Sequence, residues 1–249
     1  MDKPEQEVLE RDPWFSRVFG YDVFRINATQ TAAVDRAVLE GALQHAGERL
    51  FAYAKVDVQE VSVLQTLQSA GFRLADTNVT FEKTLERPRE DRADGRVRAA
   101  GPDDEDGAVR IAAGSFQFTR FHLDPAVPDH LADRIKEEWV KSYFRGQRGD
   151  AMLVVEENGE PKGFTLLLNS GGPEATVDLI AVAQNARRKG LARAMMTSAE
   201  VCCPAAGLMR VGTQLANMPS IRLYEGLGYH MARAEHVLHL HVNPKGGGP

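Results

Sequence analysis

In the first third of the chain, apolar residues follow a helical spacing and then an alternating one. The apolar positions of Val61–Ala70 recur about every three residues, which predicts a helix that Gly71 ends as a C-terminal cap. Asn78–Lys83 then alternates between apolar and polar residues, as a half-buried strand does. The resulting order is helix, glycine, aromatic residue and strand.

The two periods continue to follow one another through the rest of the chain. They predict helices over Asp103–Ala113, Pro128–Tyr143, Leu191–Val201 and Ser220–Gly226. They predict strands over Ala151–Glu156, Gly163–Leu168, Thr176–Val182, Met209–Thr213 and His236–Val242. The turn residues of Glu157–Pro161 join the first two strands into a hairpin. Because helices and strands alternate, the expected fold class is α/β with a mixed sheet.

A charged segment divides the chain into two parts. Glu86–Arg96 is almost wholly charged and cannot bury apolar surface, so it is expected to be a linker. The expected organisation is an N-terminal α/β region at 1–85, a linker at 86–96, a main domain at 97–242 and a flexible tail at 243–249.

One sequence pattern occurs in both parts. Thr66–Phe72 precedes an alternating strand, and Leu223–Tyr229 precedes another, each with a glycine followed by an aromatic residue. One hypothesis is that the first part is a truncated copy of the last third of the second part. The alternative is that this common order of elements recurs by chance.

Composition narrows the classes of partner. The chain has 249 residues, of which 43% are hydrophobic, and a formal net charge of −5. A polyanion-binding protein usually has a basic excess, so nucleic acid is not expected as a partner. The apolar runs are far shorter than the ~20 residues of a membrane helix. The polar N-terminus and the adjacent Cys202 and Cys203, which form no disulfide framework, predict a cytoplasmic protein without a membrane partner.

A basic loop follows the strand that ends near Val182. In Arg187–Ala192, a helix begins directly after Gly190, which allows a tight turn and close approach of a ligand to the backbone. The free N–H groups and the dipole of a helix N-terminus attract anions, and the basic side chains add charge. The loop therefore suits a pyrophosphate, although it has neither the P-loop nor the three-glycine dinucleotide pattern. The alternative interpretation is a basic surface turn.

A second motif follows about 30 residues later. Asn217 precedes the last predicted helix and can cap it, and Tyr224 lies near the end of that helix. Taken alone, a tyrosine at helical spacing such as Tyr224 is more often a core residue with a hydrogen-bonded hydroxyl than a catalytic residue.

Together, the two motifs resemble the GNAT superfamily of acetyl-CoA-dependent N-acetyltransferases. The matching elements are Ile180-Ala-Val182, Arg187-x-x-Gly190-x-Ala192 and Asn217-x-x-Ser220-x-x-x-Tyr224-x-x-x-Gly228-Tyr229. Ala192, Ser220 and Tyr229 replace the glycine, alanine and phenylalanine that are common in the family. The resemblance covers about Arg98–Val242 and implies a GNAT fold, with the N-terminal region appended to it.

The resemblance also implies the roles of individual residues. The backbone of the strand at Ile180 and Val182 would pair with the pantetheine arm of acetyl-CoA, and the amides of 188–192 would hold its pyrophosphate. Tyr224 would protonate the departing thiolate. The implied cofactor site comprises Ile180, Ala181, Val182, Arg187, Arg188, Lys189, Gly190, Leu191, Ala192 and Asn217.

Three segments resemble a narrower branch, the dTDP-fucosamine acetyltransferases: Trp14–Gly20, Phe118–His122 and Val211–Asn217. This resemblance implies a dTDP-4-amino-4,6-dideoxyhexose as acceptor, bound by Arg120, Phe121, His122 and Gln214. Independently, arginine can grip a phosphate and aromatic rings can stack a base or sugar. A homodimer would fit this branch, although no residue indicates one. The alternatives are another amine acceptor, such as a protein N-terminus, an amino acid or an antibiotic, or a non-catalytic acyl-CoA-binding module.

The general base and a metal site are the least determined features. Asp178 lies two residues before Ile180, which would place both side chains on one strand face, and His122 is the rival base. His239 and His241 share one face of the terminal strand. Because no cysteine or carboxylate is near them in sequence, no metal site is expected.

Overall fold

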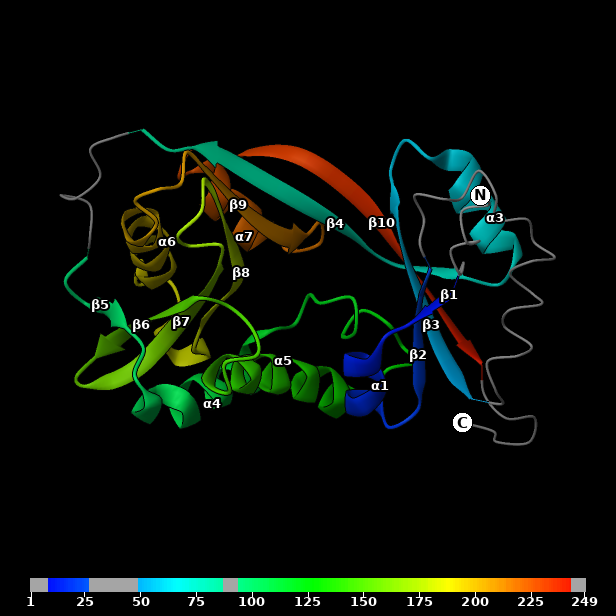
Figure 1. Ribbon diagram of the computed structural model, residues 1–249, viewed down its shortest axis with the longest axis horizontal. Helices are drawn as coiled ribbons and strands as arrows, with labels where there is room; N and C mark the ends of the chain where they lie inside the picture. The colour runs from blue at the N-terminus through cyan, green and yellow to red at the C-terminus, as the bar shows by residue number, and fades with distance from the viewer. Residues whose placement is uncertain (1–8, 27–48, 87–93, 243–249) are drawn as a thin grey trace, which may run out of the picture. The chain divides into compact units, whose positions relative to one another are not determined.

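The computed structural model describes residues 9–26, 49–86 and 94–242, which form two compact units (Figure 1). Unit 1 holds the described residues up to Asn78, the short segment Leu123–Ala126 and the chain from Ala234 onward. Unit 2 holds Val79–His122 and Val127–Arg233. These bounds differ from the predicted 1–85 and 97–242, because the end of the chain groups with the N-terminal region. Most of the predicted linker and the predicted tail lie outside the described residues.

The strands of unit 1 form a sheet that includes the order β1-β2-β3-β10. Its elements are β1 (Leu9–Arg11), α1 (Pro13–Phe19), β2 (Asp22–Ile26), β3 (Leu50–Asp57), α3 (Val61–Ser69), the start of β4 (Arg73–Thr84) and most of β10 (His230–Val242). β2 runs parallel to β3, whereas β1 and β10 run antiparallel to their neighbours. The sequence pattern predicts α3 and the strand after it but misses β1, β2 and β3.

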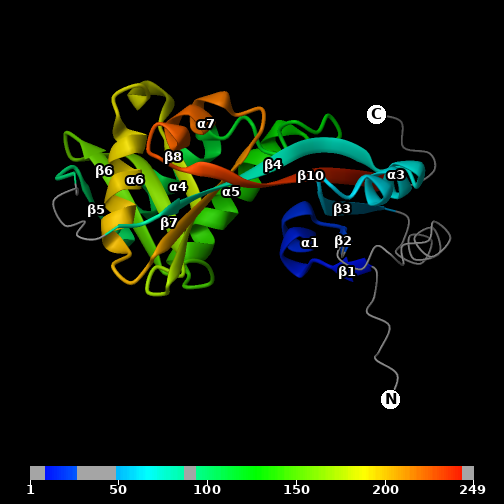
Figure 2. The ribbon, with the colours of Figure 1, turned by 90° about the horizontal axis from the view of Figure 1, so that it is seen from above.

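The two faces of this sheet differ in what covers them. Leu50, Ala52 and Leu238 belong to a buried cluster that also contains Leu67 of α3. On the opposite face, which we call the α1 face, aromatic rings of α1 meet those of β3, and Phe19 lies 5.1 Å from Phe51 between ring centroids. Figure 2 shows β10 beside β3, along the register that joins His241 to Phe51. Side chains two residues apart on β10 therefore lie on the same face of the sheet, which is either the face covered by α3 or the α1 face.

Unit 2 has the strand order β4-β9-β8-β7-β6-β5. Its strands are the end of β4, β5 (Val97–Ala99), β6 (Ala151–Glu157), β7 (Glu160–Leu168), β8 (Glu174–Val182) and β9 (Leu208–Gln214). Its helices are η3 (Pro102–Asp104), α4 (Glu105–Ser115), α5 (Asp129–Phe144), η4 (Gln184–Ala186), α6 (Leu191–Cys202) and α7 (Met218–Glu225). The predicted elements of this part are confirmed with end shifts of a few residues, and so is the α/β class.

The helices of unit 2 cover both faces of its sheet (Figure 1). α4 and α5 pack on one face, where Leu179 and Ala181 of β8 join a cluster with Ile111 and Val140. α6 packs on the other face, where Ile180 and Val182 contact a cluster with Met195. Alternate residues of β8 thus face opposite helical layers, as the pleat of a strand requires.

The predicted repeat of helix, glycine, aromatic residue and strand is present in both units. At the end of α3, the N–H groups of Phe72 and Gly71 donate to the carbonyls of Leu67 and Gln68. At the end of α7, Tyr229 and Gly228 donate in the same way to Tyr224 and Glu225. Both glycines have positive φ, +96° and +83°, which makes each end a Schellman motif. The order strand, helix, strand is β3-α3-β4 in one case and β9-α7-β10 in the other.

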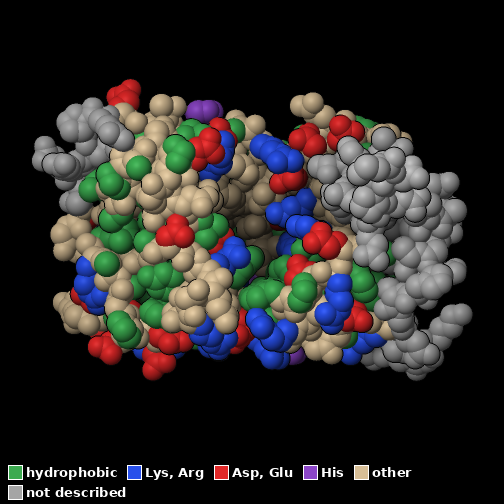
Figure 3. Space-filling view, in the orientation of Figure 1, with side chains coloured by type: hydrophobic (Ala, Val, Ile, Leu, Met, Phe, Trp, Pro, Cys, Tyr) green, Lys and Arg blue, Asp and Glu red, His purple; other side chains and the backbone are tan. Residues whose placement is uncertain are grey.

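The surface of the molecule mixes charges of both signs. On the face drawn in Figure 3, acidic and basic side chains are interspersed, and neither sign covers a broad continuous area. No helix among the described residues is both long and apolar enough to span a membrane.

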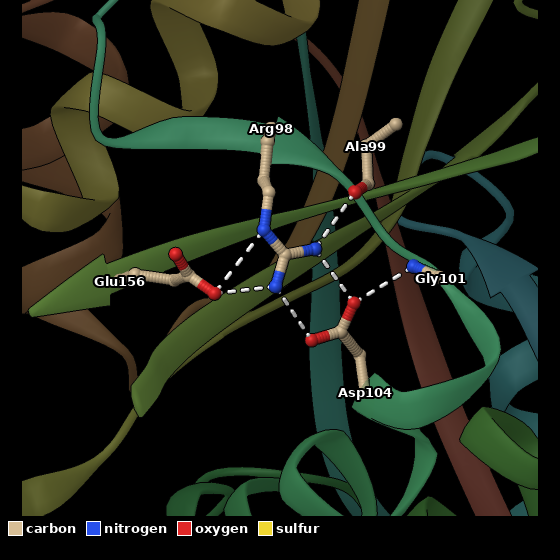
Figure 4. Close-up of polar contacts among 5 residues, drawn as sticks. All are labelled: Arg98, Ala99, Gly101, Asp104 and Glu156. Atoms are coloured by element: carbon tan, nitrogen blue, oxygen red, sulfur yellow. Dashed lines mark hydrogen bonds and ion pairs between the residues drawn. The ribbon is translucent and has the colours of Figure 1, made fainter. Parts of the chain in front are cut away.

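A buried carboxylate ties α4 to the edge of the unit 2 sheet (Figure 4). Asp104 accepts two hydrogen bonds from the guanidinium of Arg98, at 2.7 and 2.9 Å, and one from the N–H of Gly101 at 2.7 Å. The same guanidinium pairs with Glu156 on β6. The Arg98 contact holds the pKa of Asp104 below its usual value, although burial opposes this shift. The start of α4 is thereby fixed against β5 and β6.

We expect Gly163→Ala to destabilise the protein by about 1–3 kcal/mol, because the added Cβ would overpack a tight site. That Cβ would lie 2.7 Å from the carbonyl oxygen of Ala181 and 2.9 Å from Met195 Cε. Urea unfolding followed by circular dichroism measures the effect. Gly171→Ala is the matched control, since its Cβ meets nothing within 4 Å. Equal stability of the two variants would contradict this packing of β7 on β8.

Candidate active site

The two central parallel strands of unit 2 separate part-way along their length. β8 and β9 are paired from Glu174 with Leu208 to Val177 with Val211, and the pairing stops there although both strands continue. Beyond Val177, no strand among the described residues pairs with the edge of β8 that faces β9. Such an edge offers backbone groups to an extended ligand, in the manner of an added strand.

A β-bulge coincides with the point where the strands separate. On the β7 side, Leu166 pairs with Leu179 but Leu167 pairs with Val177, so Asp178 is the extra residue of the bulge. A bulge redirects side chains and interrupts the alternation of the strand.

The backbone of Ile180 and Val182 points toward the open edge. The N–H of Ala183 donates to the carbonyl of Lys162, and hydrogen-bonded pairs alternate along an antiparallel ladder. Ala181 therefore bonds with β7, whereas the N–H and carbonyl groups of Ile180 and Val182 point away from it. The carbonyl of Val182 accepts from Ser115 Oγ and Arg187 Nε, each at 3.3 Å. Ile180 is thus the residue whose backbone groups remain available.

The loop before α6 presents a row of backbone N–H groups. Arg188 and Gly190 both have positive φ, +65° and +78°, and α6 begins at Leu191 without a side-chain cap. Within the part of the chain that the structure describes, the N–H groups of 188–192 donate to no protein acceptor. Successive N–H groups in such left-handed turns and at a helix start form a concave site for anions.

The three basic side chains of this loop are engaged differently. The Arg187 guanidinium turns back and donates to the carbonyls of Val182 and, at 2.9 Å, of Ser115. Lys189 Nζ pairs with Glu157 at 2.7 Å. Arg188 is exposed and makes no ion pair with any described residue. The sequence predicts that all three side chains bind the anion. In the structure, the Arg187 side chain joins β8 to the end of α4, and its contact with an anion stays a prediction.

Asn217 is the predicted cap of α7, and the structure confirms this position. Its side-chain oxygen accepts from the N–H of Ser220 at 3.4 Å, and its Nδ2 donates to Thr213 Oγ1 at 3.1 Å. Both ends of the side chain therefore have protein partners, and its contact with the cofactor remains a prediction. Gln214, the last residue of β9, is half-buried beside it.

Tyr224 is fully buried in α7, 2% exposed. Its ring lies 5.7 Å from Phe81 and 6.2 Å from Tyr229 between centroids. Burial raises the pKa of Tyr224 above its usual value, although the side-chain hydrogen bond with Ser220 opposes this shift. The phenol therefore stays protonated, as a general acid requires. Ser220, at a position where the family commonly has alanine, makes its hydrogen bond to the phenol through the side-chain hydroxyl.

Tyr229, the other departure from the family pattern, belongs to a buried polar cluster. Its hydroxyl contacts Glu200 Oε1 of α6 at 3.1 Å, and Lys83 Nζ of β4 pairs with the same oxygen at 2.6 Å. Burial raises the pKa of Tyr229, and the charge of Glu200 adds to the rise. A phenylalanine at this position could not make the contact with Glu200. The hydroxyl of Tyr229 therefore has a structural role within unit 2.

Asp178 is held by an ion pair that the sequence does not predict. Arg148 Nε and Nη2 donate to its two oxygens, each at 2.6 Å, and the guanidinium lies 4.8 Å from the ring centroid of Trp139. Trp139 packs with the cluster under α4 and α5, whereas Ile180 packs toward α6. The prediction that Asp178 and Ile180 share a strand face is wrong, because the bulge at Asp178 breaks the alternation.

A second cationic side chain lies over the ring of Trp139. Lys136 Nζ lies 4.0 Å from the ring centroid of Trp139 and 4.9 Å from that of Phe116, and Lys136 is buried. Spacing on α5 could have indicated the pair, since Lys136 and Trp139 are three residues apart on one helix face.

The predicted acceptor segment has a defined internal structure. Arg120 lies with its guanidinium carbon 4.5 Å from the ring centroid of Phe121, and Phe121 is buried. His122 contacts Thr119 Oγ1 through Nδ1 at 2.6 Å and Asp133 Oδ1 through Nε2 at 3.0 Å. Both imidazole nitrogens are engaged, and their partners position the ring.

Comparison with known families identifies the domain that contains these residues. Residues 116–229 match the family model described as "Acetyltransferase (GNAT) family". The chain contains a GNAT acetyltransferase domain. A curated relative, "Spore coat polysaccharide biosynthesis protein SpsD" of Bacillus subtilis, is 30% identical over 142 residues, which are 56% of this chain and 48% of SpsD. The chain thus matches about half the length of that relative.

Solved structures agree on the fold. A "GCN5-related N-Acetyltransferase from Sphaerobacter thermophilus" superposes with a TM-score of 0.60 at 12% identity, over 90% of this chain and 73% of that one. A "Tandem GNAT protein from the clavulanic acid biosynthesis pathway" gives a TM-score of 0.54 at 14% identity, over 90% of this chain and 76% of that one. At these identities the likeness concerns the fold alone.

We expect Gly190→Asp to weaken the binding of coenzyme A at least about tenfold, as measured by calorimetry. The carboxylate would repel the pyrophosphate at the row of N–H groups, and positive φ is strained for any residue with a Cβ. Gly20→Asp is the matched control, because Gly20 has the same φ of +78° and open space around its Cβ position. Equal affinities of the two variants would show that the loop does not hold the pyrophosphate.

Proposed function

We propose that this protein is an acetyl-CoA-dependent N-acetyltransferase for the amine of a nucleotide-linked amino sugar. The observation that carries the first half of the proposal is the open edge of β8 beside the row of N–H groups at 188–192. The edge fits the amide-containing pantetheine arm, and the row fits the pyrophosphate at the end of that arm.

Direct transfer of the acetyl group is the reaction that fits such a site. The bound thioester supplies the acetyl group, which the neutral amine of the acceptor attacks, so that a carbon–nitrogen bond forms and the carbon–sulfur bond breaks. The nitrogen gives up its extra proton to a base, for which Asp178 and His122 are the candidates. Tyr224 retains its proton because of its burial, and it would deliver that proton to the departing thiolate. Ser220, one turn earlier in α7, is hydrogen-bonded to the phenol, and this hydrogen bond would break when the proton is transferred.

The acceptor assignment rests on separate support. The segment Phe118–His122 and the Val211–Asn217 region resemble enzymes that acetylate dTDP-linked amino sugars. SpsD, named for spore coat polysaccharide biosynthesis, points toward sugar chemistry for that relative. Trp139 with its two cations offers a ring face and positive charge of the kind that binds sugars and phosphates.

A second proposal concerns the first part of the chain. The shared Schellman motifs and the shared order of strand, helix and strand support a partial GNAT-like repeat in the N-terminal region. The fold likeness to a tandem GNAT protein over 90% of this chain supports the same interpretation. Cytoplasmic location and a homodimer stay predictions.

We expect the wild type to release coenzyme A thiol when dTDP-4-amino-4,6-dideoxygalactose is added with acetyl-CoA. Tyr224→Phe should lower kcat about 100-fold or more, because the thiolate then leaves without a proton donor, and should change the KM for acetyl-CoA little. A thiol-reactive dye measures the rate. Tyr143→Phe, which alters a half-buried tyrosine of α5, should keep the wild-type rate.

The same assay separates the alternatives. Turnover with other amines but not with the sugar nucleotide would replace the acceptor and keep the reaction. Tight binding of acetyl-CoA without thiol release on a panel of amines would favour an acyl-CoA-binding module instead.

The predicted base can be tested by its pH profile. Both oxygens of Asp178 accept hydrogen bonds from Arg148, at 2.6 Å each, so the Asp178→Asn variant also removes half of an ion pair. If Asp178 is the base, Asp178→Asn should remove the acidic limb of the kcat/KM profile. If the limb survives unchanged, Asp178 only positions Arg148, and His122→Gln becomes the next variant to measure.

A further inference from the structure

Two histidines and a carboxylate meet on the α1 face of unit 1. His239 and His241 lie two residues apart on β10, so both side chains leave the same face of the strand. Asp124, in the segment Leu123–Ala126, places Oδ2 at 2.6 Å from His239 Nδ1 and 2.8 Å from His241 Nε2. The three atoms all lie within 4.8 Å of one another.

We propose that Asp124, His239 and His241 form a binding site for one divalent first-row transition metal ion, with zinc as the best match. Two imidazoles and one carboxylate are a common ligand set for such ions, and a three-residue set leaves a coordination position for water. The carboxylate is distant in sequence, 115 residues before His239, so only the folded chain completes the set.

The spacing of the atoms is close to what a metal requires. A tetrahedral site with bonds of about 2.0–2.1 Å holds its ligand atoms about 3.3 Å apart. Asp124 Oδ2 would therefore withdraw by about 0.7 Å from His239 Nδ1 and about 0.5 Å from His241 Nε2, and the two nitrogens, which lie within 4.8 Å of each other, would approach to about the same spacing. Asp124 Oδ1 accepts from the N–H of Ala126 at 2.9 Å, which orients Oδ2 as the single ligand oxygen.

The site is enclosed, and its charge favours a cation. The side chains of His239, Asp124 and His241 are only 2%, 10% and 17% exposed. A carboxylate in so enclosed a place is costly unless a cation or hydrogen-bond donors compensate its charge, and a bound dication would do so.

The imidazole rings are held in place by an aromatic side chain. Phe51 stacks on His241 with ring centroids 4.7 Å apart and planes at 10°, and it meets His239 edge-on at 4.8 Å. Phe51 is fully buried, so it supports both rings from the β3 side. One histidine presents Nδ1 and the other Nε2, which brings both nitrogens to one point despite their separation along the strand.

A metal here would fasten the segment that follows the predicted acceptor residues. Leu123–Ala126 comes directly after His122 in the chain, and Asp124 connects this segment to β10 within unit 1. The ion would therefore act as a structural clamp within unit 1.

The test uses the full chain, purified without a histidine tag and stripped with a chelator. We expect zinc to bind at one ion per chain by calorimetry. Cobalt(II) should give the visible absorption bands of a low-symmetry nitrogen and oxygen site. A hundredfold excess of zinc over its Kd should raise the Tm by about 5 °C or more.

Asp124→Asn and His241→Gln should each weaken zinc binding at least about 100-fold and abolish the rise in Tm. His236→Gln is the matched control, because His236 lies on the opposite face of the same strand, where it contacts Thr77 Oγ1 at 3.2 Å. This variant should bind zinc as the wild type does.

Two results would overturn the proposal. One is a wild-type chain that binds no zinc or cobalt while remaining folded by circular dichroism, which would leave Asp124 as a hydrogen-bond acceptor only. The other is unchanged zinc affinity in both ligand variants, which would place the ion elsewhere. Because Asp124→Asn could unfold unit 1, His241→Gln provides the second, more exposed position to test.

Discussion

The separation of β8 from β9 is the constraint on which the candidate site depends. A parallel strand pair that stops pairing at Val177 leaves backbone groups that need partners, because buried N–H and carbonyl groups are costly without hydrogen bonds. The bulge at Asp178 occurs at this point, and the N–H groups of 188–192 lie just beyond the end of the same strand. A ligand that supplies amide groups and a pyrophosphate satisfies both sets together.

The charged side chains around this edge are largely positioned before any ligand binds. Arg187 links the end of β8 to α4, Lys189 pairs with Glu157, and Arg148 holds Asp178. Such contacts lower the entropy that would otherwise be lost when a ligand orders the site. The row of N–H groups at 188–192 is therefore formed by backbone, and its geometry depends on the two positive φ angles at Arg188 and Gly190.

Two strands of the chain are divided between the units. β4 begins in unit 1 at Arg73 and ends in unit 2, whereas β10 begins in unit 2 at His230 and continues in unit 1 from Ala234 onward. In unit 1, β10 pairs with β3, and in unit 2, β4 lies next to β9. This division explains why the chain from Ala234 onward groups with the N-terminal region, which the linear division at 86–96 could not anticipate.

The sequence alone determined most elements of unit 2, the glycine caps and the two motifs typical of the GNAT family, because these depend on local periodicity and on residues with special backbone freedom. It missed β3, whose apolar run does not alternate, and it placed Asp178 on the wrong face, because a bulge is set by pairing between strands. The partners of charged groups also lay beyond its reach. Arg148 is 30 residues from Asp178, and Asp124 is 115 residues from His239. Contacts at such separations follow from the packing of the whole sheet, so only the tertiary structure decided which side chains meet.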